Sequence, residues 1–139
     1  MAGENHPVAR FGLPGPLRDR LVSAVLRGEK TATSSLLAEW DADHARLPEV
    51  GDRLTVVDSD DRPVAVIEVT AAEVIRLGDA DMAVARAEGE GFSSAEAWRR
   101  THERFWRERV IPRLPAPLAA PLDDDTQIVV ERFRVVSDV

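Results

Sequence analysis

Residues 52–77 read "DRLTVVDSDDRPVAVIEVTAAEVIRL", and this stretch predicts the centre of the fold. Two runs rich in β-branched residues flank the polar segment "SDDR", a pattern typical of a β-hairpin. The second run is apolar at every position from Val64 to Ile67, as expected for a strand that is covered on both faces. We therefore expect a central hairpin whose second strand lies inside the sheet.

A helix and a strand are predicted ahead of this hairpin. Residues 13–28 place leucine and valine at helical spacing, with Pro16 suited to the first turn and Gly28 to the C-terminal stop. Residues 31–37, "TATSSLL", are β-branched and rich in hydroxyl groups, which favours a short strand. Residues 38–50 show no clean period, so a loop is predicted there.

Two helices and a last strand are predicted after the hairpin. A short helix within 79–91 ends at its glycines, and Ser93 with Glu96 forms a capping-box pattern that opens a longer helix over 94–111. Four prolines then mark an irregular connection before a closing strand over 126–136. The segments that connect the predicted strands are long, and strands and helices do not alternate regularly as in βαβ units. This pattern favours an α+β fold, a small mixed β-barrel with helices packed around it.

Length and composition indicate one globular domain. The chain has 139 residues, of which 44% are hydrophobic and 31% charged, and these proportions suit a soluble protein. We expect residues 1–10 to form a flexible terminus and residues 11–139 a single domain. No run is long and apolar enough for a transmembrane helix, and the start of the chain lacks the layout of a signal peptide. A cytoplasmic protein without a membrane partner is therefore predicted.

Cysteine content and charge exclude several classes of site and partner. The sequence has no cysteine, which excludes disulfides, thiolate zinc sites and cysteine nucleophiles. Its net charge of -7 argues against a general nucleic-acid binder, and no DNA partner is predicted. A local basic cleft on an acidic body stays open, because arginines cluster on the predicted long helix at Arg99, Arg100, Arg104, Arg107 and Arg109.

A single lysine, Lys30, stands among 17 arginines, within the stretch "RGEKTATSS" at residues 27–35. Lysine, unlike arginine, can lose its proton when it is buried or crowded. A neutral Lys30 could then act as the base for the hydroxyl of Thr33, provided that the chain turns between them. The alternative is a surface lysine that is favoured at a helix C-terminus by the helix dipole.

Glu88 and several aromatic side chains are further candidates. Glu88 lies beside two glycines, where it could orient a lysine or a water, or could simply be a solvated helix end. Trp98, His102 and Phe105 share one helical stripe, which suits core packing for the rings and a polar cleft for His102. Trp40 could stack on a base or cap the core.

The acidic clusters do not have the spacing of a recognised metal site. They are "DADH" at residues 41–44 and "DDD" at residues 123–125. Acidic loop residues are usually solvated, so neither a metal nor a cofactor is predicted. The sequence also lacks a glycine-rich phosphate loop and a serine nucleophile elbow.

Several motifs taken together resemble the ASCH domain (activating signal cointegrator homology), a family related to the PUA fold. They are "RGEKTAT", "LPEVGDRLTVVD", "PVAVIEVTAAEV", "ARAEGEGFSSAEAWRRTHERFW" and "VVERFRVV", which together span about Phe11 to Val136. The family signature Gly-x-Lys-x-x-Thr is matched by Gly28, Lys30 and Thr33. This resemblance implies a small PUA-like barrel with a cleft for RNA or a nucleoside.

One branch of that family removes the acetyl group from N4-acetylcytidine. The resemblance implies that Lys30, Thr33 and Glu88 are the catalytic residues. An uncharged Lys30 accepts the proton of Thr33, Thr33 attacks the acetyl carbonyl, and Glu88 orients Lys30 or helps proton transfer to the leaving amine. Backbone amides of residues 31–34 are the expected oxyanion site. We expect Trp40, Trp98 and His102 to bind the base.

The sequence also departs from that branch. The chain is longer than the compact amidohydrolases of that branch, and it has Ser35 at the position where they have an arginine. The helix that carries Trp98, His102 and Phe105 is similar to a larger subgroup, which includes a metal-dependent ribonuclease that acts on single strands. Binding or cleavage of single-stranded RNA is therefore the alternative, with the arginine-rich helix as a phosphate track. A binding module without catalysis, in which Lys30 acts as a plain cation, is a third possibility.

Overall fold

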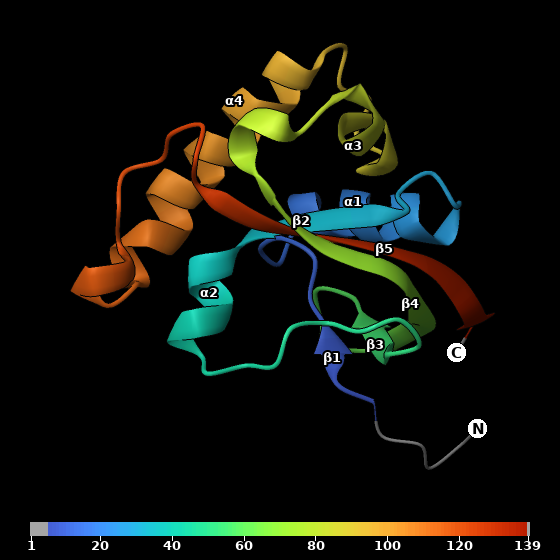
Figure 1. The fold of residues 1–139 in the computed structure, drawn as a ribbon. Coiled ribbons are helices and arrows are strands. Elements are labelled where there is room, and N and C mark those ends of the chain that lie inside the picture. Colours follow the sequence, from blue (N-terminus) through green and yellow to red (C-terminus); the bar gives the residue numbers. More distant parts are fainter. Residues whose placement is uncertain (1–5, 139) are drawn as a thin grey trace.

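The structure, a computed structural model, describes residues 6–138 of the chain. Its centre is a five-stranded sheet in the order β1-β3-β4-β5-β2 (Figure 1). The strands are β1 (Val8–Ala9), β2 (Ala32–Leu36), β3 (Arg53–Val57), β4 (Pro63–Arg76) and β5 (Gln127–Asp138). Strand β1 runs parallel to β3, and all other neighbours are antiparallel.

The predicted hairpin and the α+β class are confirmed, and the sheet order places the hairpin near its centre. Strands β3 and β4 form the hairpin, and the long β4 also pairs with β5 from Ala65 to Arg76. Register shifts in the β4–β5 ladder mark bulges, which bend and twist the sheet. The expected barrel is open, however, because β1 and β2 lie at opposite edges and no ladder joins them among the described residues.

Four α-helices pack around the sheet. They are α1 (Pro16–Leu26), α2 (Leu37–Ala42), α3 (Met82–Ala87) and α4 (Ala95–Phe105), and α4 continues into a π-helical turn (Trp106–Val110). Short 3-10 turns follow at Leu77–Asp79, Ile111–Arg113 and Ala116–Leu118. Helices α3 and α4 lie together on one side of the sheet in Figure 1. Within the described residues no helix has the length and apolar character needed to cross a membrane.

Two local predictions need correction. The loop predicted over 38–50 begins instead as helix α2, which is too short to display a period in sequence. The carboxylate of Glu39 stabilises its start by accepting the N–H of Leu36 at 2.8 Å. The cap of α4 is Ser94 rather than Ser93, since the Ser94 hydroxyl accepts the N–H of Ala97.

The N-terminal segment also differs in part from the prediction. Residues 1–5 of the expected flexible terminus lie outside the described residues. Of the remainder, Val8–Ala9 form strand β1, and the carbonyl of Pro7 accepts the N–H of Thr55 at 2.9 Å. This strand brings residues 8–12 to the mouth of the cleft described below.

Two apolar clusters cover the two faces of the sheet. Helices α3 and α4 bury Val84 and Trp98 against Ala32 and Val130, while α1 buries Leu21 against Phe133. Each large apolar side chain buried in this way contributes roughly 1.5–3 kcal/mol. Because the helices leave part of the sheet uncovered beside β2, a cleft forms at that edge.

Candidate active site

A cleft of about 630 Å³ runs over the edge strand β2, a volume within the range of small-molecule sites. Thr33 and Ser35 line it from one face of β2 and Ser34 from the other, since side chains alternate along a strand. The other polar side chains that contribute are Lys30, Glu39, Asp43, Glu88, Glu90, Thr101, His102 and Glu131. Aromatic rings of Phe11, Trp40, Phe105, Trp106 and Phe133 complete the wall.

Lys30 enters the cleft through the turn that ends α1. Gly28 adopts a φ of 76°, and the backbone N–H groups of Glu29 and Lys30 both donate to the carbonyl of Ala24. The chain therefore reverses toward the sheet just before Lys30, and the Lys30 side chain is only 2% exposed. Lys30 is thus neither a surface lysine nor unpartnered.

The Lys30 amine has three oxygen acceptors. Its Nζ lies 2.9 Å from the carbonyl of Ala32, 3.2 Å from the carbonyl of Glu88 and 2.7 Å from Oε1 of Glu88. An ammonium has three N–H donors, and each has an acceptor here. This arrangement suits a charged lysine, in contrast to the neutral amine that the sequence-based mechanism requires.

Glu88 is the buried partner of that charge. Its side chain is 1% exposed, and its second oxygen, Oε2, accepts the Ser34 hydroxyl at 2.7 Å and the Trp98 indole N–H at 3.3 Å. Burial alone would raise the pKa of Glu88, but the charge of Lys30 and the nearby His102 outweigh it and lower the pKa to about 2. Glu88 is therefore a permanent carboxylate at neutral pH.

Gly89 is required by the close approach of two backbone segments. A Cβ at this position would lie 2.5 Å from the N and Cα atoms of Lys30, and the glycine φ is 72°. The N–H of Thr31 donates to the carbonyl of Ala87 at 2.7 Å, which joins the same two segments. The glycine that follows Glu88 in sequence thus permits the contact between Glu88 and Lys30.

Thr33 lines the same cleft as Lys30 and Glu88, but among the described residues its side chain is not a hydrogen-bond partner of either. In β2 the side chain of Thr33 points to the face opposite Ser34, and Ser34 is the residue whose hydroxyl reaches Glu88. The cross-strand partner of Thr33 is Glu131 of β5. The three residues of the predicted triad therefore share one cleft, with Thr33 on a different side of the strand.

The three predicted base-binding residues have different environments. Trp40 lines the cleft, and its indole N–H donates to the Ser35 hydroxyl at 2.9 Å. His102 also lines it and is 13% exposed. Trp98 does not line the cleft: its ring is fully buried and stacks on that of His102, with ring centroids 4.5 Å apart, so its contact with a base stays a prediction.

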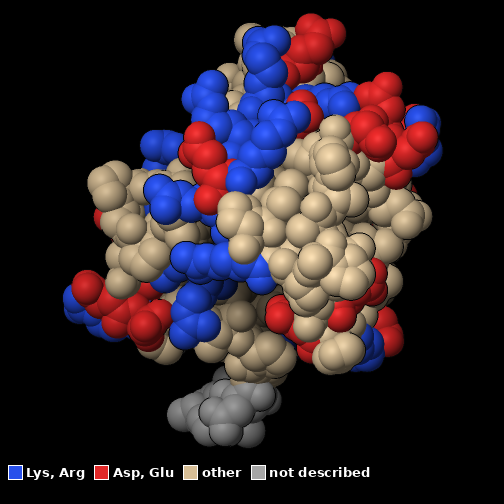
Figure 2. All heavy atoms as spheres, turned by 90° about the vertical axis from the view of Figure 1, so that its left-hand side faces the viewer, with Lys and Arg blue, Asp and Glu red and all other residues tan. Residues whose placement is uncertain are grey.

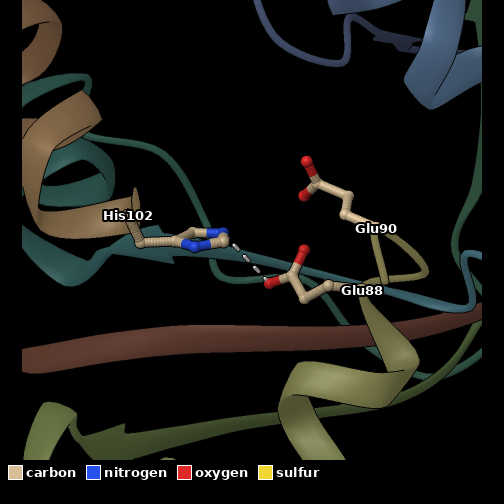
Figure 3. Close-up of side chains that lie close together, drawn as sticks. All are labelled: Glu88, Glu90 and His102. Carbon is tan, nitrogen blue, oxygen red and sulfur yellow. Dashed lines mark ion pairs between the residues drawn. The ribbon is translucent and has the colours of Figure 1, made fainter. Parts of the chain in front are cut away.

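His102 is oriented by its own helix. Its Nδ1 lies 2.9 Å from the carbonyl of Trp98, so Nδ1 carries the hydrogen. The other nitrogen, Nε2, lies 3.5 Å from Oε2 of Glu88. Figure 3 shows this contact and places Glu90 on the same side of the ring.

Glu88, Glu90 and His102 are the described residues that could bind a metal ion, because their ligand atoms lie within 4.8 Å of one another (Figure 3). Both oxygens of Glu88 already accept hydrogen bonds, and one of them pairs with Lys30. A divalent cation would have to compete with this ammonium. The cluster therefore has the ligand types of a metal site but not an open carboxylate at Glu88.

Three residues of the cleft were not identified from the sequence. Ser34 lies within the lysine motif, but only the structure shows that it, and not Thr33, reaches Glu88. Glu90 follows Glu88 by two residues, and burial raises its pKa. Glu131 interrupts the apolar strand "TQIVVERFRVV", and this break in the pattern is the signal that could have revealed it.

Comparison with known proteins identifies relatives of this chain. The family model of the ASCH domain matches residues 8–137. A crystal structure of a protein of Enterococcus faecalis V583, assigned to family DUF984, superimposes with a TM-score of 0.81 at 28% identity over 95% of this chain and 77% of that one. A crystal structure of an ASCH domain from Lactobacillus crispatus JV V101 gives 0.81 at 27% identity, over 95% and 80%. No curated protein matches significantly.

Proposed function

The chain belongs to the ASCH domain family, and on this basis we propose that it is a hydrolase that cleaves an amide on a modified nucleoside. The proposed reaction converts N4-acetylcytidine and water into cytidine and acetate. The proposal extends the resemblance of Gly28, Lys30 and Thr33 to the amidohydrolase branch of the family. The cleft and its charges support it.

One observation carries the proposal: Thr33 shares a cleft of about 630 Å³ with a buried lysine–glutamate pair. A hydroxyl group can attack a carbonyl in a cleft that also holds a fixed positive charge, because that charge favours the oxyanion that develops. The aromatic rings of Trp40 and Phe105 offer flat apolar walls for a base.

The roles of the residues follow from their contacts. Thr33 is the nucleophile. Lys30, in its charged form, supplies the cation, and Glu88 holds Lys30 in place together with Ser34 and His102. This assignment replaces a neutral Lys30 with an ammonium, since its amine has three acceptors.

The backbone of Ser34 is the best candidate for an oxyanion donor among residues 31–34. The N–H of Thr31 already donates to Ala87. The carbonyl of Ala32 accepts from Lys30 and so points away from β5. In an antiparallel edge strand the backbone groups of every second residue point away from the neighbouring strand, so the N–H of Ser34 points away from β5 as well.

The proposal is tested by incubating the protein with N4-acetylcytidine and measuring cytidine by chromatography. Thr33→Val keeps the shape of the side chain and removes the hydroxyl, and we expect turnover to fall on the order of 10³-fold or more. Thr31→Val is the matched control, because Thr31 is exposed and does not line the cleft. It should retain wild-type turnover.

Lys30→Ala is a poor control on its own, since it leaves a buried carboxylate at Glu88 without its partner. Thr33→Val avoids this problem because, among the described residues, the Thr33 side chain is not a hydrogen-bond partner of the ion pair. Cytidine release at equal rates by the wild type and Thr33→Val would contradict the proposed nucleophile. No release by the wild type would refute the proposed substrate.

The basic surface supports a second candidate, the binding of single-stranded RNA. Figure 2 shows basic side chains on the side of the molecule where α4 and α2 lie, and they are arginines because the one lysine of the chain is buried. Arg100 and Arg104 of α4 and Arg109 of the π-helical turn are exposed, and no ion pair engages them within residues 6–138. RNA affinity that falls steeply with salt, and that Arg100→Gln with Arg104→Gln weakens, would favour this function over hydrolysis of a free nucleoside.

A further inference from the structure

Glu131 is a half-buried acidic residue that lines the cleft, and the triad does not use it. It lies in β5 directly opposite Thr33 of β2. Residues opposite one another in an antiparallel pair point to the same face, with Cβ atoms roughly 4.5–5.5 Å apart. The Glu131 carboxyl group and the Thr33 hydroxyl therefore project side by side into the cleft that both residues line.

The carboxyl group of Glu131 has no counter-charge. Within the described part of the chain, no hydrogen-bond donor or cation contacts it. Burial, and to a smaller degree the negative charge of Asp52 at the start of β3, raises its pKa to about 7. A carboxyl group with such a value can both take up and release a proton near neutral pH.

Other charged groups surround the same cleft. They are Arg10 beside β1, Lys30 before β2, Glu39 and Asp43 from α2, Glu88 and Glu90 after α3, and His102 from α4. Among charged groups, Asp52 is the one that shifts the pKa of Glu131, and its negative charge raises this pKa. The ammonium of Lys30 is turned toward Glu88 and the carbonyl of Ala32 instead.

We propose that Glu131, rather than Lys30, is the general base that activates the Thr33 hydroxyl. Lys30 has no free lone pair while its three N–H groups are donated, and Glu88 is held by other donors. Glu131 is the remaining proton acceptor beside Thr33. The substrate in this inference is taken from the proposed function. The placement of Glu131 beside Thr33 does not depend on it, because that placement comes from the strand register.

The proton and bond changes balance as follows. Glu131 takes the hydroxyl proton while Thr33 Oγ bonds to the acetyl carbon, and the bond from that carbon to N4 of the base then breaks. Glu131 returns the proton to N4, so that cytidine leaves and an acetyl ester remains on Thr33. Water attacks this ester and gives one proton to Glu131, the bond between Thr33 Oγ and the acetyl carbon breaks, and acetic acid leaves and loses its proton to solvent as acetate. Glu131 finally returns that proton to Thr33 Oγ.

The test separates Glu131 from the choice of nucleoside by using p-nitrophenyl acetate, a small activated ester. The protein is exposed to the ester between pH 5 and 9 and quenched with acid, and acetylation of Thr33 is measured by peptide mass spectrometry. Because Lys30 is the only lysine and is buried, side-chain amines contribute little background. We expect the wild-type rate to rise with pH around a midpoint near 7.

Glu131→Gln should slow acetylation of Thr33 by about 10²-fold or more and remove this pH dependence. Glu73→Gln is the matched control, because Glu73 is an exposed glutamate of the neighbouring strand β4 outside the cleft. It should leave the rate and the pH midpoint unchanged. Circular dichroism of both variants confirms that each one is folded.

Two outcomes would overturn the proposal. One is acetylation of Thr33 at the same rate and with the same pH profile in Glu131→Gln as in the wild type. The other is absence of Thr33 acetylation in the wild type, which would mean that no base activates this hydroxyl. Acetylation that depends on Glu131, without any turnover of N4-acetylcytidine, would support the base and refute only the substrate.

Discussion

Lys30 and Glu88 lie 58 residues apart in the sequence and form a buried ion pair, with 2.7 Å between Nζ and Oε1. The pair joins the end of α1 to the end of α3 and sets the wall of the cleft. It also connects to Ser34, Trp98 and His102 through the second oxygen of Glu88. Its contribution to stability should therefore be measurable apart from any activity.

Glu88→Gln should destabilise the protein by about 3–5 kcal/mol at pH 7, because it leaves the Lys30 charge buried and unpaired. The folded pKa of Glu88 is about 2, below its ordinary value of 4.5. The stabilisation is therefore complete above pH 4.5 and is lost as the pH falls toward 2. Urea unfolding at pH 7 and at pH 3 should show a smaller difference between variant and wild type at the lower pH. A constant difference would contradict this assignment.

Glu131 should have the opposite effect on stability. Its folded pKa of about 7 lies above its ordinary value of 4.5, so the folded state binds more protons than the unfolded state between these values. The wild type accordingly loses stability as the pH rises through this window. Glu131→Gln should raise the free energy of unfolding by ~2 kcal/mol at pH 8 and give no such gain at pH 4. Thermal melts at the two pH values, with Glu73→Gln alongside, provide the measurement.

Gly89→Ala should disrupt the contact between the loop after α3 and Lys30. The added Cβ would lie 2.5 Å from backbone atoms of Lys30 and from the carbonyl oxygen of Glu29, and the φ of 72° is unfavourable for alanine. Gly91→Ala is the matched control, since its φ is 77° but no atom lies within 4 Å of the new Cβ. In chemical denaturation, Gly91→Ala should lower the free energy of unfolding by only ~1–2 kcal/mol. Gly89→Ala should lower it clearly more. Equal losses would show that the close approach is not important.

Removal of divalent metals should leave the proposed hydrolysis unchanged. The ammonium of Lys30 already occupies Oε1 of Glu88 and would oppose a cation there. After dialysis against EDTA, turnover of N4-acetylcytidine should persist, and Mn²⁺ or Zn²⁺ should not raise the melting temperature. If Mn²⁺ does raise it, and Glu90→Gln abolishes the rise, then Glu88, Glu90 and His102 do bind a metal (Figure 3). That result would favour a metal-dependent ribonuclease.

Trp40→Ala should weaken the binding of cytidine. The indole ring lines the cleft and is held by its hydrogen bond to Ser35, and stacking of a base on an aromatic ring is worth about 1–3 kcal/mol. The dissociation constant, measured by calorimetry, should rise roughly 5- to 150-fold. Leu47→Ala, an exposed change outside the cleft, serves as the control. If the dissociation constant for cytidine is unchanged in Trp40→Ala, then the indole ring contributes to the packing of α2 but does not bind the base.

Much of the fold could be predicted from local patterns. The hairpin, helix α1 with its stop at Gly28, and the α+β class all follow from period and turn residues, which depend on neighbours along the chain. The same reasoning missed α2, because six residues are too few to reveal a period. It also left open whether Trp98 lies in the core or in the cleft, since a helical stripe alone does not distinguish the two.

By itself, the sequence determined which residues were candidates: a single lysine after a helix stop, a threonine three residues later and a glutamate before a glycine. The tertiary structure alone decided how they meet. Glu88 reaches Lys30 because two backbone segments touch at Gly89, and Glu131 stands beside Thr33 because of the register between β2 and β5. Such contacts join distant parts of the chain, and local periodicity carries no information about which distant residues will pair. For this reason the lysine could be found in the sequence, but its charge and the base beside Thr33 could be inferred only from the fold.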